Sequence, residues 1–158
     1  MHIFDKLPFA SVNLINGQAE KLEKESERYG QLLAENPVDV VCMGIGENGH
    51  IAFNDPPVAD FEDKKKIKVV ELDNICRQQQ VNDGCFLTFN DVPEKAFTLT
   101  IPSLMKASAL FCVVPGERKA EAVANTFNQQ VISKYPSTIL RTHNNAVLYL
   151  DKQSSQKL

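Results

Sequence analysis

The chain has 158 residues, of which 43% are hydrophobic and 23% charged, and its formal net charge is −3. These values fit a single globular domain, residues 1–158, with no run near the roughly 18 apolar residues that a membrane helix needs. The small negative charge gives no long-range attraction to nucleic acid or to an anionic membrane.

The cysteines and the first residues of the chain indicate the cellular compartment in which we expect the protein. The chain begins without the basic and apolar regions of a secretory signal, and its four cysteines show no C-x-x-C spacing. Cysteines in apolar surroundings usually pack as small hydrophobic residues. We therefore expect a reducing, cytoplasmic location. No His/Cys/Asp cluster has metal-ligand spacing, so no metal site is expected.

Short apolar segments with two different periods alternate along the chain. Strands are predicted over residues 12–15, 38–43, 67–72, 97–101, 109–114 and 146–150. Amphipathic helices are predicted after the first, third and fifth of these strands, the second of them capped by Asp73 and ending near Val81, just before Gly84. The last helix is expected to open at Gly116.

Strands that alternate with helices indicate an α/β fold with a largely parallel sheet. In such sheets ligands bind beyond the carboxyl ends of the strands. Two loops are expected at that edge, residues 44–57 and residues 115–119. We therefore look for chemistry in these two loops.

Residues 44–49 (GIGENG) form a G-x-G-x-x-G pattern behind a strand, with Glu71 at the end of the next strand. This is the dinucleotide-binding fingerprint. That site needs a long helix beginning at the last glycine, whose N-terminus holds the pyrophosphate. Pro56 and Pro57 would end any helix within about two turns. The surroundings of the pattern therefore disfavour a dinucleotide site.

The same loop carries a histidine and a carboxylate. His50 and Asp55 are five positions apart, and Gly44, Gly46 and Gly49 allow the backbone to approach a bound ligand closely. A carboxylate that orients an imidazole makes a unit for proton transfer near neutral pH. Alternatively, the histidine only caps the turn and the aspartate only begins the proline bend. The residues alone leave both interpretations open.

Residues 44–56 (GIGENGHIAFNDP) resemble the signature loop of glucosamine-6-phosphate deaminases/isomerases, and more distantly that of 6-phosphogluconolactonases. In the lactonases the histidine is typically followed by Thr-Ala-Ser, whereas residues 51–54 here are IAFN, which favours the deaminase branch. The likeness continues through residues 92–100 and 116–120. It covers the chain from residue 12 to about residue 151.

The resemblance implies a three-layer α/β/α sandwich that converts an amino-sugar 6-phosphate into a ketose 6-phosphate and ammonia, without metal or redox cofactor. It assigns His50 to opening of the sugar ring by proton transfer. Asp55 stands in the place of a glutamate that assists the histidine, and Asn48 in the place of an aspartate. An amide cannot accept a proton or stabilise an imidazolium by charge. This departure puts the strength of ring opening, or the identity of the substrate, in question.

A second predicted site is for phosphate. Lys119 lies at the first turn of the helix after residues 109–114, where backbone N–H groups and the helix dipole also attract anions. Deaminases use a lysine here, although a solvated lysine is the ordinary alternative. They pair it with an arginine where this chain has Gln80, with Arg77 one turn earlier. Either Arg77 substitutes or the pocket has lost a charge.

The resemblance further implies parts that this sequence does not contain. Full-length members carry a Gly-Gly phosphate loop and an Asp-Glu pair, whose aspartate moves a proton between C1 and C2, and neither dipeptide occurs here. We expect a family fold truncated at its N-terminus, with little or no deaminase activity alone. We also expect homo-oligomers that cover an exposed sheet edge. The alternatives are a non-catalytic sugar-phosphate-binding module and a 6-phosphogluconolactonase-like hydrolase.

Overall fold

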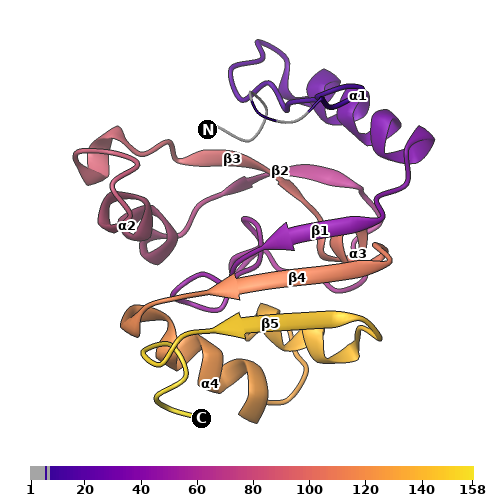
Figure 1. Ribbon diagram of the computed structural model, residues 1–158. Coiled ribbons are helices and arrows are strands. Elements are labelled where there is room, and N and C mark those ends of the chain that lie inside the picture. Colours follow the sequence, from indigo (N-terminus) through magenta and orange to yellow (C-terminus); the bar gives the residue numbers. More distant parts are fainter. Residues whose placement is uncertain (1–5, 7) are drawn as a thin grey trace.

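A parallel three-stranded sheet organises the molecule (Figure 1). The computed structural model describes residue 6 and residues 8–158. The strands of this sheet are β1 (Val40–Met43), β4 (Ala109–Val114) and β5 (Ala146–Leu150), in the order β1-β4-β5. β4 pairs in parallel with both neighbours. The predicted α/β class with a parallel sheet is confirmed.

The other two strands form a separate antiparallel pair. They are β2 (Ile67–Glu71) and β3 (Lys95–Leu99). Between them come α2 (Asn74–Asn82) and the short 3-10 helix η1 (Phe89–Asp91). The connection leaves and re-enters at the same end of the pair, so α2 is an insertion in a long hairpin and not a crossover helix. The alternating pattern had suggested that these two strands belong to the parallel sheet. They form a separate sheet instead.

The remaining helical elements follow the chain order of the strands. α1 precedes β1, α3 follows β3, and the other three lie within the connection from β4 to β5. Their bounds are α1 (Leu22–Glu35), α3 (Ile101–Met105), η2 (Glu117–Lys119), α4 (Ala120–Asn128) and η3 (Pro136–Thr142). None of the helices in the described part of the chain is long and apolar enough to cross a membrane.

The helix signals in the sequence are confirmed at α2. The Asp73 side chain accepts a hydrogen bond from the backbone N–H of Cys76, 2.8 Å away, and so caps the helix. Gly84 lies two residues past the helix end with a φ of 75°, a conformation that glycine adopts without strain. Gly116, also predicted to open a helix, has a φ of 94° and precedes η2.

The predicted strand over residues 12–15 is wrong, because no strand forms there. Its carbonyl groups are bound by side chains of α1 and not by a neighbouring strand. Arg28 donates to the carbonyl of Leu14 at 3.0 Å, and the Tyr29 hydroxyl donates to the carbonyl of Asn13 at 3.2 Å. Leu14 is 67% exposed. The apolar run is therefore a surface segment held along the helix.

The two faces of the parallel sheet differ in burial. Side chains alternate along β4, so that Leu110, Cys112 and Val114 point inward while Phe111 and Val113 are exposed. The inward core consists of Ile45, Ile51, Ile101, Leu104, Ala107, Leu110, Cys112, Val114, Ala122, Val123 and Leu140. The outward side chains form an apolar sheet face of Val40, Cys42, Phe111, Val113, Val147 and Tyr149.

This difference predicts the effects of two substitutions. Leu110, fully buried on the central strand, should lose about 2–5 kcal/mol of unfolding free energy when changed to Ala, because a cavity remains. Val147→Thr on the exposed face should stay within about 0.5 kcal/mol of the parent. Urea unfolding followed by circular dichroism measures both. Equal losses for the two variants would contradict the assigned core.

Candidate functional site

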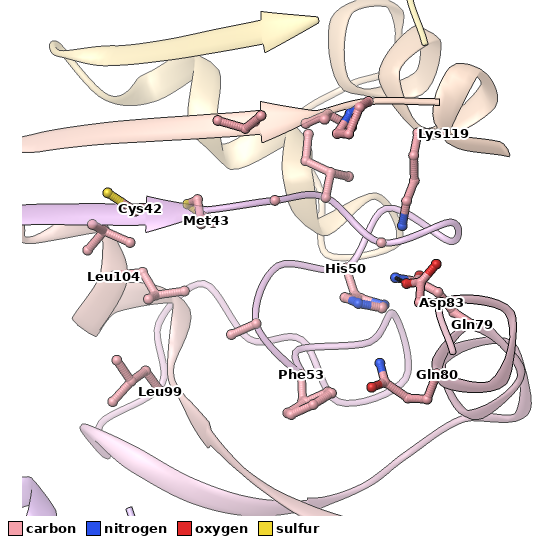
Figure 2. A pocket seen from close by; sticks show the side chains of 18 residues that line it. Cys42, Met43, His50, Phe53, Gln79, Gln80, Asp83, Leu99, Leu104 and Lys119 are labelled. Carbon is pink, nitrogen blue, oxygen red and sulfur yellow. Dashed lines mark hydrogen bonds between the residues drawn. The ribbon is translucent and has the colours of Figure 1, made fainter. Parts of the chain in front are cut away.

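A cleft of about 680 Å³ lies beyond the carboxyl ends of β1 and β4 (Figure 2). This is the edge at which the sequence predicted ligand-binding loops, and both loops contribute. The lining residues are Val41, Cys42, Met43, Gly44, Ile45, Gly46, His50, Ala52, Phe53, Gln79, Gln80, Asp83, Leu99, Leu104, Val113, Val114, Pro115 and Lys119. Of the predicted site residues, Gly44, Gly46, His50, Gln80 and Lys119 therefore line the cleft.

The loop after β1 folds back on itself at Gly46. The Gly46 N–H donates to the carbonyl of His50 at 2.9 Å, and the Gly49 N–H donates to the carbonyl of Gly46 at 3.0 Å. A Cβ atom at position 46 would collide with the imidazole ring of His50. Glycine is thus required here so that the ring can lie against the backbone.

Three other elements hold this loop from outside. The Ser137 N–H of η3 donates to the carbonyl of Gly49 at 2.9 Å. The side chain of Asn54, fully buried, donates to the carbonyl of Leu99 at 2.9 Å. On the α2 side, the Glu47 N–H donates to the Gln79 side chain at 2.9 Å. The loop is therefore fixed by contacts that lie far from it in sequence.

The structure brings His50, Asp55 and Asn48 together, as predicted from the loop. The His50 Nδ1 atom is 2.9 Å from Asp55 Oδ1 and 2.8 Å from Asn48 Oδ1. Both neighbours accept hydrogen bonds, so Nδ1 carries the hydrogen. Among the described residues, none bonds to Nε2, the second nitrogen of a ring that lines the cleft. The lone pair of neutral His50 is therefore on Nε2.

Asn48 lies behind the histidine, and its two ends have different partners. Its Oδ1 atom accepts from the His50 backbone N–H at 3.1 Å, as well as from Nδ1. Its Nδ2 atom donates to Asp55 Oδ1 at 3.0 Å and to Asp73 Oδ2 at 3.1 Å. An ionised carboxylate at this position would face two others with no hydrogen to share. The amide therefore suits these surroundings.

Charge at the centre of the site is set by burial and hydrogen bonding. Burial alone would raise the pKa of the Asp55 carboxyl, but hydrogen bonds from His50 and Asn48 outweigh it and hold that pKa below its ordinary value of 3.8. Burial, then the nearby Asp55 and Asp73 charges, raises the pKa of the Cys76 thiol to about 12. The aspartate is thus ionised and the thiol neutral at pH 7.

The sequence did not indicate Cys76 as part of this site. It lies 21 positions from Asp55 in the chain, so no ligand spacing was visible. In the structure, the cap at Asp73 fixes the first turn of α2, and the thiol comes close to His50 and Asp55. The helix start was predictable, but the packing of that helix against the loop was not.

Lys119, the last residue of η2, reaches the cleft from the β4 side (Figure 2). Burial lowers the pKa of its ammonium group, against the opposing attraction of Asp83 and Glu47. Its neighbour Arg118 is 57% exposed and forms ion pairs with Glu47 at 3.2 Å and with Asp83 at 3.4 Å. Arg118 thus neutralises the acidic rim, while Lys119 is the cation within the cleft lining.

Of the two positions proposed for a second phosphate contact, one lines the cleft and the other does not. Gln80 lines the cleft. Arg77 points elsewhere: it donates to the carbonyls of Phe89 at 3.2 Å and Val92 at 2.9 Å, and it stacks on the Phe89 ring at 4.2 Å. Gly49, the third glycine of the pattern, supports the loop and does not line the cleft. Sequence reasoning missed the lining residues Phe53, Gln79 and Asp83.

The chain is thus an α/β protein with a histidine–aspartate pair and a lysine at the carboxyl ends of parallel strands, the edge at which proteins of this class commonly bind small molecules. Residues 1–149 match the sequence model of a family described as glucosamine-6-phosphate isomerases/6-phosphogluconolactonase. The chain belongs to this family, and the predicted resemblance is confirmed.

Individual relatives agree with this assignment. The glucosamine-6-phosphate deaminase of Bacillus cytotoxicus is 41% identical over 152 residues, which cover 96% of this chain and 56% of the relative. That of Bacillus cereus strain B4264 is 40% identical over the same length. The chain therefore spans about half the length of the curated relatives it matches.

Solved structures share the fold. A monomeric glucosamine-6-phosphate deaminase superposes with a TM-score of 0.84 at 30% identity, covering 91% of this chain and 58% of that one. The 6-phosphogluconolactonase of Trypanosoma brucei gives a TM-score of 0.65 at 19% identity, covering 87% of this chain and 54% of that one. The second likeness shows the fold alone.

The close approach at Gly46 predicts the effect of one added methyl group. Gly46→Ala should push the His50 ring away from Asp55 and weaken the Nδ1 hydrogen bond. Proton–nitrogen NMR of the ring should then show loss of the fixed Nδ1–H tautomer. Gly17→Ala, where an added Cβ meets nothing within 4 Å, is the control. An unchanged ring spectrum in Gly46→Ala would contradict the geometry.

The Asp55 carboxylate predicts a contribution to acid stability. Because its folded pKa lies below 3.8, its stabilising effect is complete above that value and is lost as pH falls through the folded pKa. Asp55→Asn should therefore lose less stability than the parent between about pH 5 and pH 2. Thermal unfolding across this range measures the difference. The control is Asp39→Asn at an exposed position, which should leave the pH profile unchanged.

Proposed function

We propose that the cleft binds an amino-sugar 6-phosphate and that His50 opens the sugar ring. The observation that carries the proposal is the fixed tautomer, with Nδ1 held by Asp55 and Asn48 and the Nε2 lone pair available at the cleft. The names of the relatives, glucosamine-6-phosphate deaminases, supply the substrate class.

Ring opening needs one proton to move between two oxygens of the sugar. Neutral His50 accepts the proton of the anomeric hydroxyl at Nε2 and delivers it to the ring oxygen as the bond between that oxygen and C1 breaks. Between these two proton transfers the His50 imidazole is protonated and positively charged. The buried Asp55 carboxylate, 2.9 Å from Nδ1, stabilises this charge. Asn48 contributes orientation but no charge.

The phosphate group would lie at Lys119, which lines the same cleft as His50. Lys119 supplies an ammonium group there, next to the backbone N–H groups at the start of α4. Gln80 lines the same cleft, and its side-chain amide can donate hydrogen bonds to a phosphate without adding charge. Binding of a dianion therefore depends mainly on Lys119.

We further propose that the 158-residue chain alone releases ammonia slowly. Conversion to a ketose requires a base that moves a proton between C1 and C2. Among the described lining residues, Asp83 is the one carboxylate that could serve as this base. It already accepts a hydrogen bond from Gln79 at 3.1 Å and pairs with Arg118. Without a dedicated base the rate should be about 10²–10⁴-fold lower than with one.

A non-catalytic sugar-phosphate-binding module is the second candidate. It is favoured by Gln80 in the cleft and by the absence, among the described lining residues, of a carboxylate free of hydrogen-bonding or ionic partners. In this alternative the ligand binds and dissociates unchanged. The two candidates share the binding step and differ only in turnover.

The proposed assembly and location rest on other features. The apolar sheet face of Val40, Cys42, Phe111, Val113, Val147 and Tyr149 offers a surface for self-association. All four cysteines are free, which agrees with a reducing cytoplasm. Light scattering that finds only monomer would remove the oligomer from the proposal.

Calorimetric titration with glucosamine 6-phosphate and galactosamine 6-phosphate, beside an ammonia assay, tests the proposal. Lys119→Met should weaken binding by about 10–100-fold, since a charge-assisted hydrogen bond is lost. The matched control is Lys134→Met at an exposed position, which should bind as the parent does. Binding without ammonia selects the module, slow ammonia release selects the enzyme, and no binding by the parent rejects both.

A further inference from the structure

Three side chains that commonly bind metal ions converge beneath the cleft. His50, Asp55 and Cys76 each offer one ligand atom, and these atoms all lie within 4.8 Å of one another. The three residues are 6%, 1% and 0% exposed. The first two come from the loop after β1 and the third from α2. Only the first two have a role in the proposed ring opening.

The set matches the coordination chemistry of zinc. Zn²⁺ takes thiolate, imidazole and carboxylate ligands at about 2.0–2.3 Å in a tetrahedron, which places its ligand atoms about 3.3–3.8 Å apart. The present spacing needs only small side-chain movements to reach these values. A mixed sulfur, nitrogen and oxygen set also selects Zn²⁺ over Mg²⁺ or Ca²⁺, which prefer oxygen alone.

The surroundings support a cation at this point. The Asp73 carboxylate adds a second negative charge nearby, since the Asn48 side chain donates to both Asp55 and Asp73. Outer partners already orient the carboxylate, since Asn48 Nδ2 donates to Asp55 Oδ1 at 3.0 Å and the Asp73 N–H donates to Oδ2 at 3.4 Å. Such outer contacts are typical of metal sites.

We propose that His50, Asp55 and Cys76 form a Zn²⁺ site that switches off the ring-opening histidine. The ion binds Nδ1 of His50, a carboxylate oxygen of Asp55 and the Cys76 sulfur, with the fourth position open to Asn48 Oδ1, 2.8 Å from Nδ1. The Cys76 thiol proton leaves to solvent, and the Nδ1 proton is replaced by one on Nε2. One proton is thus released for each ion bound to the neutral-histidine form.

The consequence for the histidine follows from its two nitrogens. With Nδ1 bound to the ion, Nε2 carries a hydrogen and cannot accept one from a sugar hydroxyl. The metal-binding part of the inference stands on the geometry alone, whereas the inhibitory part rests on the proposed function of His50. Access is through the cleft and past the histidine ring, because Cys76 is fully buried.

Co²⁺ serves as an optical probe of the site in the full 158-residue chain. Tetrahedral Co²⁺ with one thiolate should give a sulfur-to-cobalt absorption band that added Zn²⁺ removes. Calorimetry of Zn²⁺ binding in two buffers of different ionisation enthalpy should report about one released proton, as coordination of a thiol requires. Proton–nitrogen NMR should show His50 change from the Nδ1–H to the Nε2–H form.

Cysteine variants locate the sulfur. Cys76→Ala should abolish the band and weaken Zn²⁺ binding by at least about 10–100-fold, the loss typical of even an outer-shell partner. Cys85→Ala, at an exposed thiol, is the matched control and should keep the band. Cadmium-113 NMR of the unaltered chain, whose shift reports one sulfur ligand, gives a test that does not depend on the folding of a variant.

The outcomes separate the two parts of the inference. A missing band in the parent chain, a band that survives Cys76→Ala in folded protein, or a cadmium shift without sulfur would overturn the metal site. A bound ion that leaves His50 in its Nδ1–H form would overturn the inhibition. None of these measurements uses sugar-phosphate turnover, so failure of the proposed function leaves them unaffected.

Discussion

The hydrogen bond between His50 Nδ1 and Asp55 is the interaction on which the site depends. It joins two nearly buried groups at 2.9 Å, one of them an ionised carboxylate that burial alone would disfavour. The surrounding contacts make this burial tolerable: an amide hydrogen from Asn48 and a backbone N–H from Asp73 share the negative charge. The glycine at position 46 leaves room for the ring, and the histidine presents its other nitrogen to the cleft.

Much of this arrangement was predictable from local sequence. The continuous apolar runs of β4 and β5 have the predicted bounds, since a short apolar run bounded by turn residues is typical of a strand. The cap at Asp73 was equally clear. The pairing of β2 with β3 was not, because an inserted helix in a hairpin and a crossover helix look alike in sequence. The apolar run before α1 misled for a related reason: periodicity does not show which backbone partner a segment will find.

The residues of the site likewise fall into those that local sequence predicted and those that it did not. His50, Asp55 and Asn48 are close in sequence, and a single turn brings them together. Cys76, Gln79 and Asp83 belong to the α2 region, and their contribution depends on how that region packs on the loop. Departures from the family pattern also became intelligible only in space. Asn48 donates to two carboxylates, so its neutrality fits its neighbours, while Arg77 is occupied by the carbonyls near η1.

The insertion of α2 within the β2–β3 hairpin has a dynamic consequence. This one helical segment supplies the cap that orients Asn48, the thiol beside Asp55 and part of the cleft wall. It is held to the loop after β1 by side-chain hydrogen bonds, and the β2–β3 pair that carries it is not part of the parallel sheet. Local opening of such a segment costs less than global unfolding. The rate of amide hydrogen exchange in α2 would thus depend on whether His50 keeps its Nδ1–H hydrogen bond to Asp55. A ligand that binds both the helix and the loop would slow exchange in α2 and leave exchange in the parallel sheet unchanged.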